Sequence, residues 1–133
     1  MIQRIQSLFL FASAIISAIG ALLVFKSDLF LAESNLKNLL LVGFTASAFL
    51  SLGSLFMYKN RMFQIKLNLL NFVLNLVIIG LFVFYLLNLS GGVFAPEKGI
   101  WLLLPIFAMG SLVLANRHIR KDQELVKSVD RIR

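Results

Sequence analysis

The sequence predicts an all-α integral membrane protein, a four-helix bundle that forms one domain over residues 1–133. Two observations carry this prediction. Hydrophobic residues make up 59% of the chain and charged residues only 14%, which is more apolar surface than one small soluble core can bury. The chain also contains four stretches without a charged residue or histidine, each about 20 residues or longer, the length that a helix needs to cross a bilayer.

The first two spans are predicted at residues 5–25 and 38–58. Arg4 precedes the first span, and residues 18–20 loosely resemble a signal-peptide cleavage site. Apolar residues continue beyond that point to Phe25, so cleavage would fall inside the apolar segment. We therefore expect a retained membrane helix.

The third and fourth spans are predicted at residues 67–88 and 100–116. The third charge-free stretch is longer than one span needs, and residues 90–92 (Ser-Gly-Gly) interrupt it, so we expect a glycine-rich loop through Gly99. Pro105 then falls in the first or second turn of the fourth span, where it either opens the helix or kinks it near its outer end.

Residues 117–133 are predicted to form a cytoplasmic amphipathic helix. Its apolar residues Leu125, Val129 and Ile132 fall on one stripe, with charged residues between them. The sequence allows two roles for this stripe. One is packing on the membrane or on the basic loop between the second and third spans, and the other is docking of a partner.

Lysine and arginine are distributed unevenly between the two predicted sides of the membrane. One side has Lys26, Lys37 and Lys98, and the other has the remaining ten of the thirteen. Because cytoplasmic loops are enriched in these residues, both termini are predicted to be cytoplasmic (N-in/C-in).

The third span carries amides at helical spacing. Steps of four, three and four residues place them on one side of the helix: Gln64, Asn68, Asn71 and Asn75. An unpaired amide in hydrocarbon costs several kcal/mol, so this polar face must meet protein or water. Hydrogen bonding inside the bundle is the favoured interpretation, ahead of a contact with another subunit and of a polar conduit.

Small residues on the first two spans form the expected partners of these amides. They recur at spacings of four and allow helix backbones to approach closely: Ser13 and Ser17 on the first span, and Gly43, Ser47 and Ser51 on the second.

Six basic residues lie where the predicted spans meet the cytoplasm. They are Lys59, Arg61, Lys66, Arg117, Arg120 and Lys121. Setting the topology is their favoured role, and contact with anionic lipid headgroups or a partner is the second. The net charge of +7 lies beside apolar segments, which argues for a membrane surface and against nucleic acid.

An enzyme is not expected. The chain has no cysteine, and its one histidine, His118, lies among arginines at the end of the fourth span. No Asp, Glu, Lys, Arg or His lies inside a predicted span, whereas pumps and proton-coupled transporters usually keep such a group there. We therefore predict no catalytic residue, no cofactor and no metal site.

Three stretches resemble a family of uncharacterised four-span membrane proteins found in Bacteroidetes-type bacteria. They are Met1-Ile2-Gln3-Arg4-Ile5-Gln6, Phe56-Met57-Tyr58-Lys59-Asn60-Arg61 with Gln64-Ile65, and the close from Leu114-Ala115-Asn116-Arg117 to Asp130-Arg131-Ile132-Arg133. The resemblance covers the whole length. It implies an inner-membrane protein and brings no activity, substrate or catalytic residue.

The leading functional hypothesis is a non-enzymatic accessory or scaffold subunit of a membrane assembly. Its expected partners are the lipid bilayer and either another membrane protein or a second copy of the chain. The alternative is a small oligomeric channel or solute facilitator, in which the amides would line the path.

Overall fold

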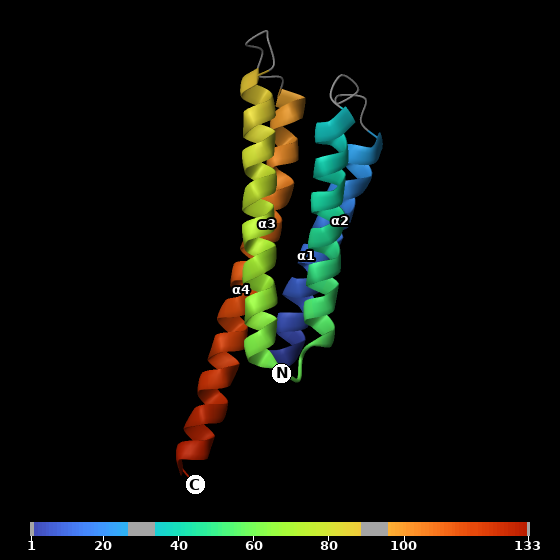
Figure 1. Ribbon diagram of the computed structural model, residues 1–133. Helices are drawn as coiled ribbons and strands as arrows, with labels where there is room; N and C mark the ends of the chain where they lie inside the picture. The colour runs from blue at the N-terminus through green and yellow to red at the C-terminus, as the bar shows by residue number, and fades with distance from the viewer. Residues whose placement is uncertain (1, 27–33, 89–95, 133) are drawn as a thin grey trace.

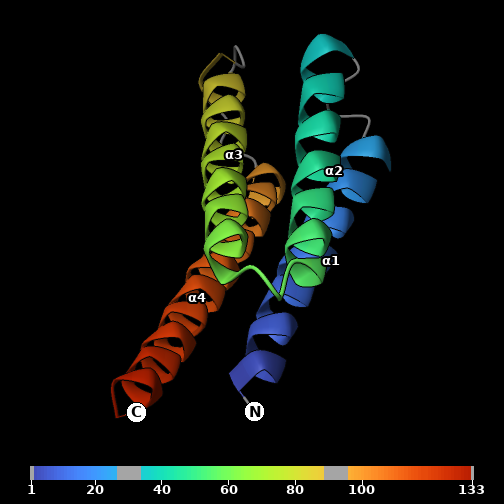
Figure 2. The ribbon, with the colours of Figure 1, turned by 60° about the horizontal axis from the view of Figure 1, so that its bottom comes forward.

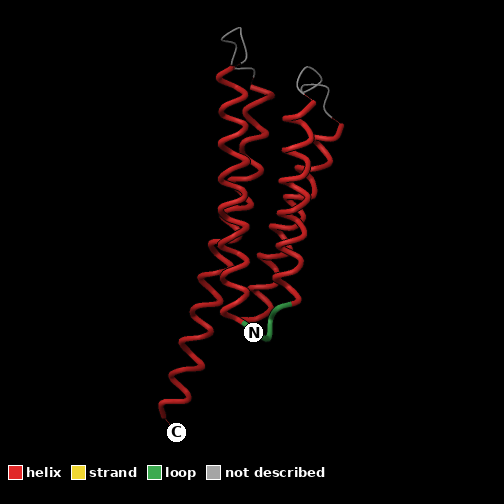
Figure 3. Tube along the Cα trace, viewed as in Figure 1, coloured by secondary structure: helices red, strands yellow, loops and turns green. Residues whose placement is uncertain are grey.

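A computed structural model describes residues 2–26, 34–88 and 96–132 of the chain. These residues form four helices, α1 (Ile2–Lys26), α2 (Ser34–Phe56), α3 (Arg61–Asn88) and α4 (Pro96–Ile132). The helices alternate in direction, so the N-terminus, the turn between α2 and α3 and the C-terminal part of α4 lie at one end (Figure 1). We call this the charged end of the bundle. Figure 3 shows helix along nearly all of the described chain, with residues 57–60 as the short turn.

The four helices form a ring in which each one has two neighbours. α1 packs against α2 and α4, and α3 packs against the same two helices from the other side (Figure 2). Among the described residues, the backbones of the diagonal pairs α1–α3 and α2–α4 do not approach each other closely. The contacts that hold the interior therefore run around the ring.

The distribution of polarity is the reverse of that in a soluble protein. Large apolar side chains cover the outside, where Phe49 is 74% exposed and Leu87 is 77% exposed. Amides and hydroxyls fill much of the inside, and Asn68, Asn71 and Asn75 are 0% exposed. Each helix also contains a stretch that is long and apolar enough to cross a bilayer. Four helices suited to crossing a membrane, with apolar side chains on the outside of the bundle, indicate a multi-pass membrane protein.

Two apolar clusters complete the interior. The larger lies at the end away from the termini and contains Val24, Leu40, Phe44, Ile78, Phe82 and Tyr85. The smaller, made of Leu10, Leu112 and Ala115, joins α1 to α4. In the larger cluster, Phe44 and Phe82 meet edge to face with their ring centroids 6.4 Å apart. Such pairs add about 0.5–1.5 kcal/mol to the burial of the rings.

Gly20 allows α2 to approach α1 closely at the larger cluster. A Cβ atom at this position would lie only 2.6 Å from the ring of Phe44, which is 1% exposed. The glycine on α2 is less tight, because a Cβ at Gly43 would lie 3.1 Å from Ile78. Small residues thus set the spacing between α1 and α2 and, less strictly, between α2 and α3.

Most helices extend further than the apolar segments from which the spans were predicted, although α2 ends at Phe56 and not at Tyr58. α3 begins at Arg61 and not at Leu67, so the basic segment before the third span is mostly helix. Its Arg, Met, Gln and Lys residues favour helix, and their charged groups need only remain near water. α4 begins at Pro96, which is a favourable residue for the first helical position, so the loop predicted through Gly99 ends earlier. Residues 89–95 lie outside the described part.

The fourth span and the C-terminal segment are one helix. α4 runs for 37 residues without interruption, which gives a length of about 56 Å at 1.5 Å per residue. Pro105 lies inside it, in the third turn and not in the first or second. The C-terminal end of α4 projects past the other three helices (Figure 1). A single rigid element therefore connects the membrane bundle to the space beyond the charged end.

Candidate functional site

Ser47 is the centre of a buried hydrogen-bonded network that we call the polar layer. Its hydroxyl donates to Asn71 Oδ1 at 2.6 Å, and Asn75 Nδ2 donates to the Ser47 Oγ atom at 2.9 Å. The Ser17 Oγ atom lies 3.0 Å from the same oxygen. A serine hydroxyl has one proton, and that of Ser47 goes to Asn71, so Ser17 must be the donor in this pair. Ser47 thus gives one hydrogen bond and accepts two, and it joins α1, α2 and α3.

Asn71 is the second branching point of the polar layer. Its amide nitrogen donates to the carbonyl oxygen of Ser47 at 3.1 Å and to the hydroxyl of Ser51 at 2.7 Å. Ser51 in turn lies 3.1 Å from the hydroxyl of Ser13 on α1. Asn71 therefore forms hydrogen bonds with two successive turns of α2, and the contact between Ser51 and Ser13 connects the network to α1.

The polar layer continues toward the charged end through Asn68. Ser54 donates to Asn68 Oδ1 at 2.7 Å, and the Asn68 amide nitrogen donates to Asn116 Oδ1 on α4 at 2.8 Å. Gln64 closes this end by donating to the Ser54 carbonyl oxygen at 3.1 Å. All four helices are thereby connected by side-chain hydrogen bonds.

The structure places the four predicted amides inside the bundle, where they bond to this chain's own helices. The serines of α2 receive them, while Ser13 and Ser17 bond to α2 serines and not to the amides. Gly43 lies outside the network and packs against Ile78. The Asn75 Oδ1 atom is buried without a hydrogen-bond partner in the described structure, and so is Gln6 Nε2.

Sequence reasoning missed two members of this interior, Asn116 and Gln6. Asn116 is the last residue of the fourth charge-free stretch and reads as an interfacial residue, yet it pairs with Asn68. Gln6 is 7% exposed although it lies one turn into α1 beside charged sequence. The sequence signal for Asn116 is its position next to a basic boundary, because Asn116 directly precedes Arg117 and Asn68 lies two residues after Lys66.

Arg61 differs from the other five basic residues predicted to contact lipid. Its guanidinium group forms an ion pair with Asp122 on α4, with a nitrogen–oxygen distance of 2.9 Å, and both side chains are mostly buried. The other five, Lys59, Lys66, Arg117, Arg120 and Lys121, are exposed. Arg61 thus fixes α4 to the start of α3, and the others remain accessible from outside the bundle.

Breaking this ion pair should loosen α4 at the charged end. We expect Asp122→Asn to speed trypsin cleavage after Arg120 and Lys121 about twofold to fivefold, because a partly exposed ion pair contributes up to about 1 kcal/mol. The rates are measured on purified protein in detergent. Asp130→Asn, a change of an exposed acid further along the same helix, should leave them unchanged. A difference that persists in 1 M salt contradicts the electrostatic origin.

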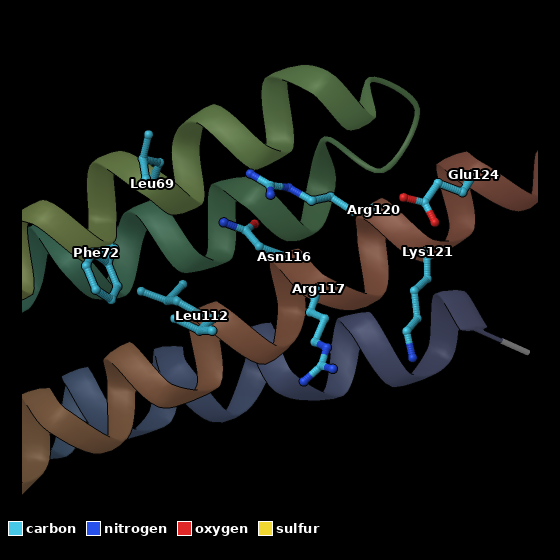
Figure 4. Close-up of a pocket in the computed structure, with 9 residues that line it drawn as sticks. Leu69, Phe72, Leu112, Asn116, Arg117, Arg120, Lys121 and Glu124 are labelled. Carbon is cyan, nitrogen blue, oxygen red and sulfur yellow. The ribbon is translucent and has the colours of Figure 1, made fainter. Parts of the chain in front are cut away.

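A groove of about 550 Å³ runs between α3 and α4 at the charged end (Figure 4). Its inner part is apolar and is lined by Leu69, Phe72, Leu112 and Val113. Asn116 lies at the middle, and the outer part is ionic, with Arg117, Arg120, Lys121 and Glu124. We call it the basic groove. Most residues from α4 fall in adjacent pairs that recur every four positions, so they form a band along one side of that helix.

His118 is not among the residues that line this groove, and its ring packs on α1. Its ring centroid is 5.4 Å from that of Phe9, and its Nδ1 atom lies 2.7 Å from the carbonyl oxygen of Leu114. A carbonyl oxygen can only accept, so Nδ1 carries a hydrogen. Within the described residues, no group of three His, Asp or Glu side chains could hold a metal ion.

Comparison with known proteins gives a family and no activity. Residues 29–132, which include α2, α3 and α4 entirely, match the model of a domain of unknown function (DUF4293). No curated protein and no solved structure matches the chain.

Proposed function

The chain belongs to the DUF4293 family, and we propose that it is a non-enzymatic accessory or scaffold subunit of an assembly in a bacterial inner membrane. The projecting end of α4 is the docking element, and its partner is an amphipathic helix of another subunit. The resemblance of its charged-end segments to proteins of Bacteroidetes-type bacteria supports such a cell as its source.

The observation that carries this proposal is the uncovered apolar stripe on the end of α4. Leu125 is 53% exposed, Val129 is 58% exposed and Ile132 is 86% exposed. Steps of four and three residues keep them on one side of the helix, and they lie beyond the bundle, where charged residues flank them. An apolar stripe with charged edges is the complement of another helix of the same kind, as in coiled coils.

The charge distribution supports an orientation with both termini in the cytoplasm. Arg4, the turn of residues 57–60 and the basic residues of α4 from Arg117 onward lie at the charged end (Figure 1). Lys26, Lys37 and Lys98 lie at the other end. Because positively charged residues favour the cytoplasmic side, the stripe on α4 faces cytoplasmic proteins or the cytoplasmic helices of membrane partners.

The burial of the polar layer favours a scaffold subunit over a channel. A conduit for ions or solutes needs amides that water can reach, whereas Asn68, Asn71 and Asn75 are fully buried and are bonded to serines and to Asn116. The same burial removes the amide face as a docking surface, which leaves the stripe on α4 for that role. The channel alternative has no comparable observation in its favour.

Photo-crosslinking in native membranes tests the docking element. A benzoylphenylalanine at Val129 should yield one discrete crosslinked band, whereas the same group at Lys127, on the opposite side of the helix, should yield about a tenth of it or less. Adding Leu125→Glu should abolish the band, because a charge in the stripe opposes helix pairing. Equal yields from both positions contradict the proposal. A band at twice the chain mass overturns the assignment to another subunit and replaces it with self-association.

A further inference from the structure

We propose that the basic groove binds one anionic phospholipid, with its phosphate between the cationic side chains of α4 and an acyl chain along the apolar inner part. This inference does not depend on the partner of the α4 stripe. It rests on where the groove lies, on its unpaired charges and on its shape.

The groove extends across the predicted membrane boundary, where the apolar residues of the spans meet charged residues. The Asn68–Asn116 hydrogen bond aligns α3 with α4 at this level, and the Arg61–Asp122 ion pair aligns them again nearer the end of the bundle. Leu112 therefore lies on the membrane side of the boundary, and Arg117 and Arg120 lie just beyond it. A phospholipid has the same order of groups, from acyl chain to glycerol to phosphate.

The cations of the groove are available to an anion. In the described part of the chain, the side chains of Arg117, Arg120 and Lys121 make no hydrogen bond or ion pair with another residue. They carry three positive charges against the single carboxylate of Glu124. Two of them are arginines, whose planar guanidinium groups bind phosphate oxygens with two parallel hydrogen bonds.

The inner part of the groove provides shape and not a hydrophobic driving force. An acyl chain leaves one apolar surrounding for another when it moves from bulk lipid onto Leu69 and Phe72, so little free energy is gained. The volume of about 550 Å³ is typical of a small-molecule site. Selectivity among lipids must therefore come from the headgroup, and a neutral lipid with identical chains should bind far more weakly.

Lipid binding by the purified full-length protein tests this proposal. Native mass spectrometry with phosphatidylglycerol should show one tightly bound molecule per chain, and phosphatidylcholine with the same acyl chains should bind about 30-fold more weakly or not at all. The double variant Arg117→Gln/Arg120→Gln should weaken phosphatidylglycerol binding about 30-fold, since a well-placed charge near the membrane surface contributes about fivefold. Equal binding of the two lipids overturns the proposal.

Matched variants separate a groove from diffuse attraction. Lys59→Gln/Arg131→Gln removes two exposed charges outside the groove and should change binding less than threefold. Leu69→Trp narrows the inner part, whereas Val73→Trp adds the same bulk to a nearby exposed position on α3. Only Leu69→Trp should reduce binding. If both charge pairs have equal effects, or inorganic phosphate at millimolar concentration displaces the lipid completely, the groove does not hold an intact lipid.

Discussion

Replacing Ser47 with alanine is expected to lower the free energy of unfolding by about 2–4 kcal/mol. The change removes one oxygen and almost no volume, yet it breaks the hydrogen bonds of Ser47 with Ser17, Asn71 and Asn75 together. Interhelical hydrogen bonds in membranes contribute about 0.6–2 kcal/mol each, and each buried partner left unpaired adds a desolvation cost. Reversible unfolding in mixed detergent micelles, followed by circular dichroism, measures this difference.

Ser111→Ala is the matched control for this prediction. The Ser111 hydroxyl donates a hydrogen bond to the Phe107 carbonyl oxygen at 3.0 Å. Both residues belong to α4, so this bond does not join two helices. Its loss should change stability by less than about 0.5 kcal/mol, as is usual for a substitution away from a buried network. If the two serine variants unfold alike, the polar layer does not hold the helices together.

Substituting Gly20 by alanine is expected to destabilise the bundle by about 1–3 kcal/mol, the usual cost of overpacking a core. The added methyl group would lie 2.6 Å from the Phe44 ring, which is 1% exposed and packs edge to face on Phe82. Either the ring or the two helices must then shift at this level. The same unfolding assay measures the change in stability. A change in the near-ultraviolet circular dichroism spectrum, which reports on aromatic side chains, should accompany it.

Gly53→Ala provides the comparison for Gly20→Ala. A Cβ atom at Gly53 would meet nothing within 4 Å. Both variants gain the helix propensity of alanine, about 1 kcal/mol relative to glycine, so their difference reports the contact with Phe44 alone. A Gly20→Ala protein as stable as Gly53→Ala would contradict the close approach of α1 and α2.

The number and approximate positions of the helices could be predicted because lipid imposes a simple rule. Charge-free stretches of sufficient length must be spans, and polar side chains within them must point inward. The face formed by Asn68, Asn71 and Asn75 followed from helical spacing alone, and so did the serines of α2 that receive it. These inferences need no knowledge of how the helices are arranged.

The partners that depend on the arrangement could not be predicted. Asn116 could pair with Asn68 only once α4 was placed beside α3, because a shared position next to a basic boundary does not say which two helices are neighbours. The Arg61–Asp122 ion pair and the basic groove depend on the same placement. The start of α3 at Arg61 was missed for a different reason, since a helix can continue through charged residues once it leaves the bilayer.

The order of the polar contacts around the ring has a consequence for biosynthesis. Within the described residues, every hydrogen bond between side chains of different helices joins helices that are consecutive in the chain: Ser17 of α1 to α2, Ser47 to α3, and Asn68 to α4. If the helices insert into a membrane in chain order, each new helix therefore meets its hydrogen-bonding partner in the helix inserted just before it. The α1–α4 contact, which joins the ends of the chain and is built around Leu10, Leu112 and Ala115, can form last. Insertion can thus proceed step by step during translation, without polar groups waiting unpaired in lipid for a distant segment.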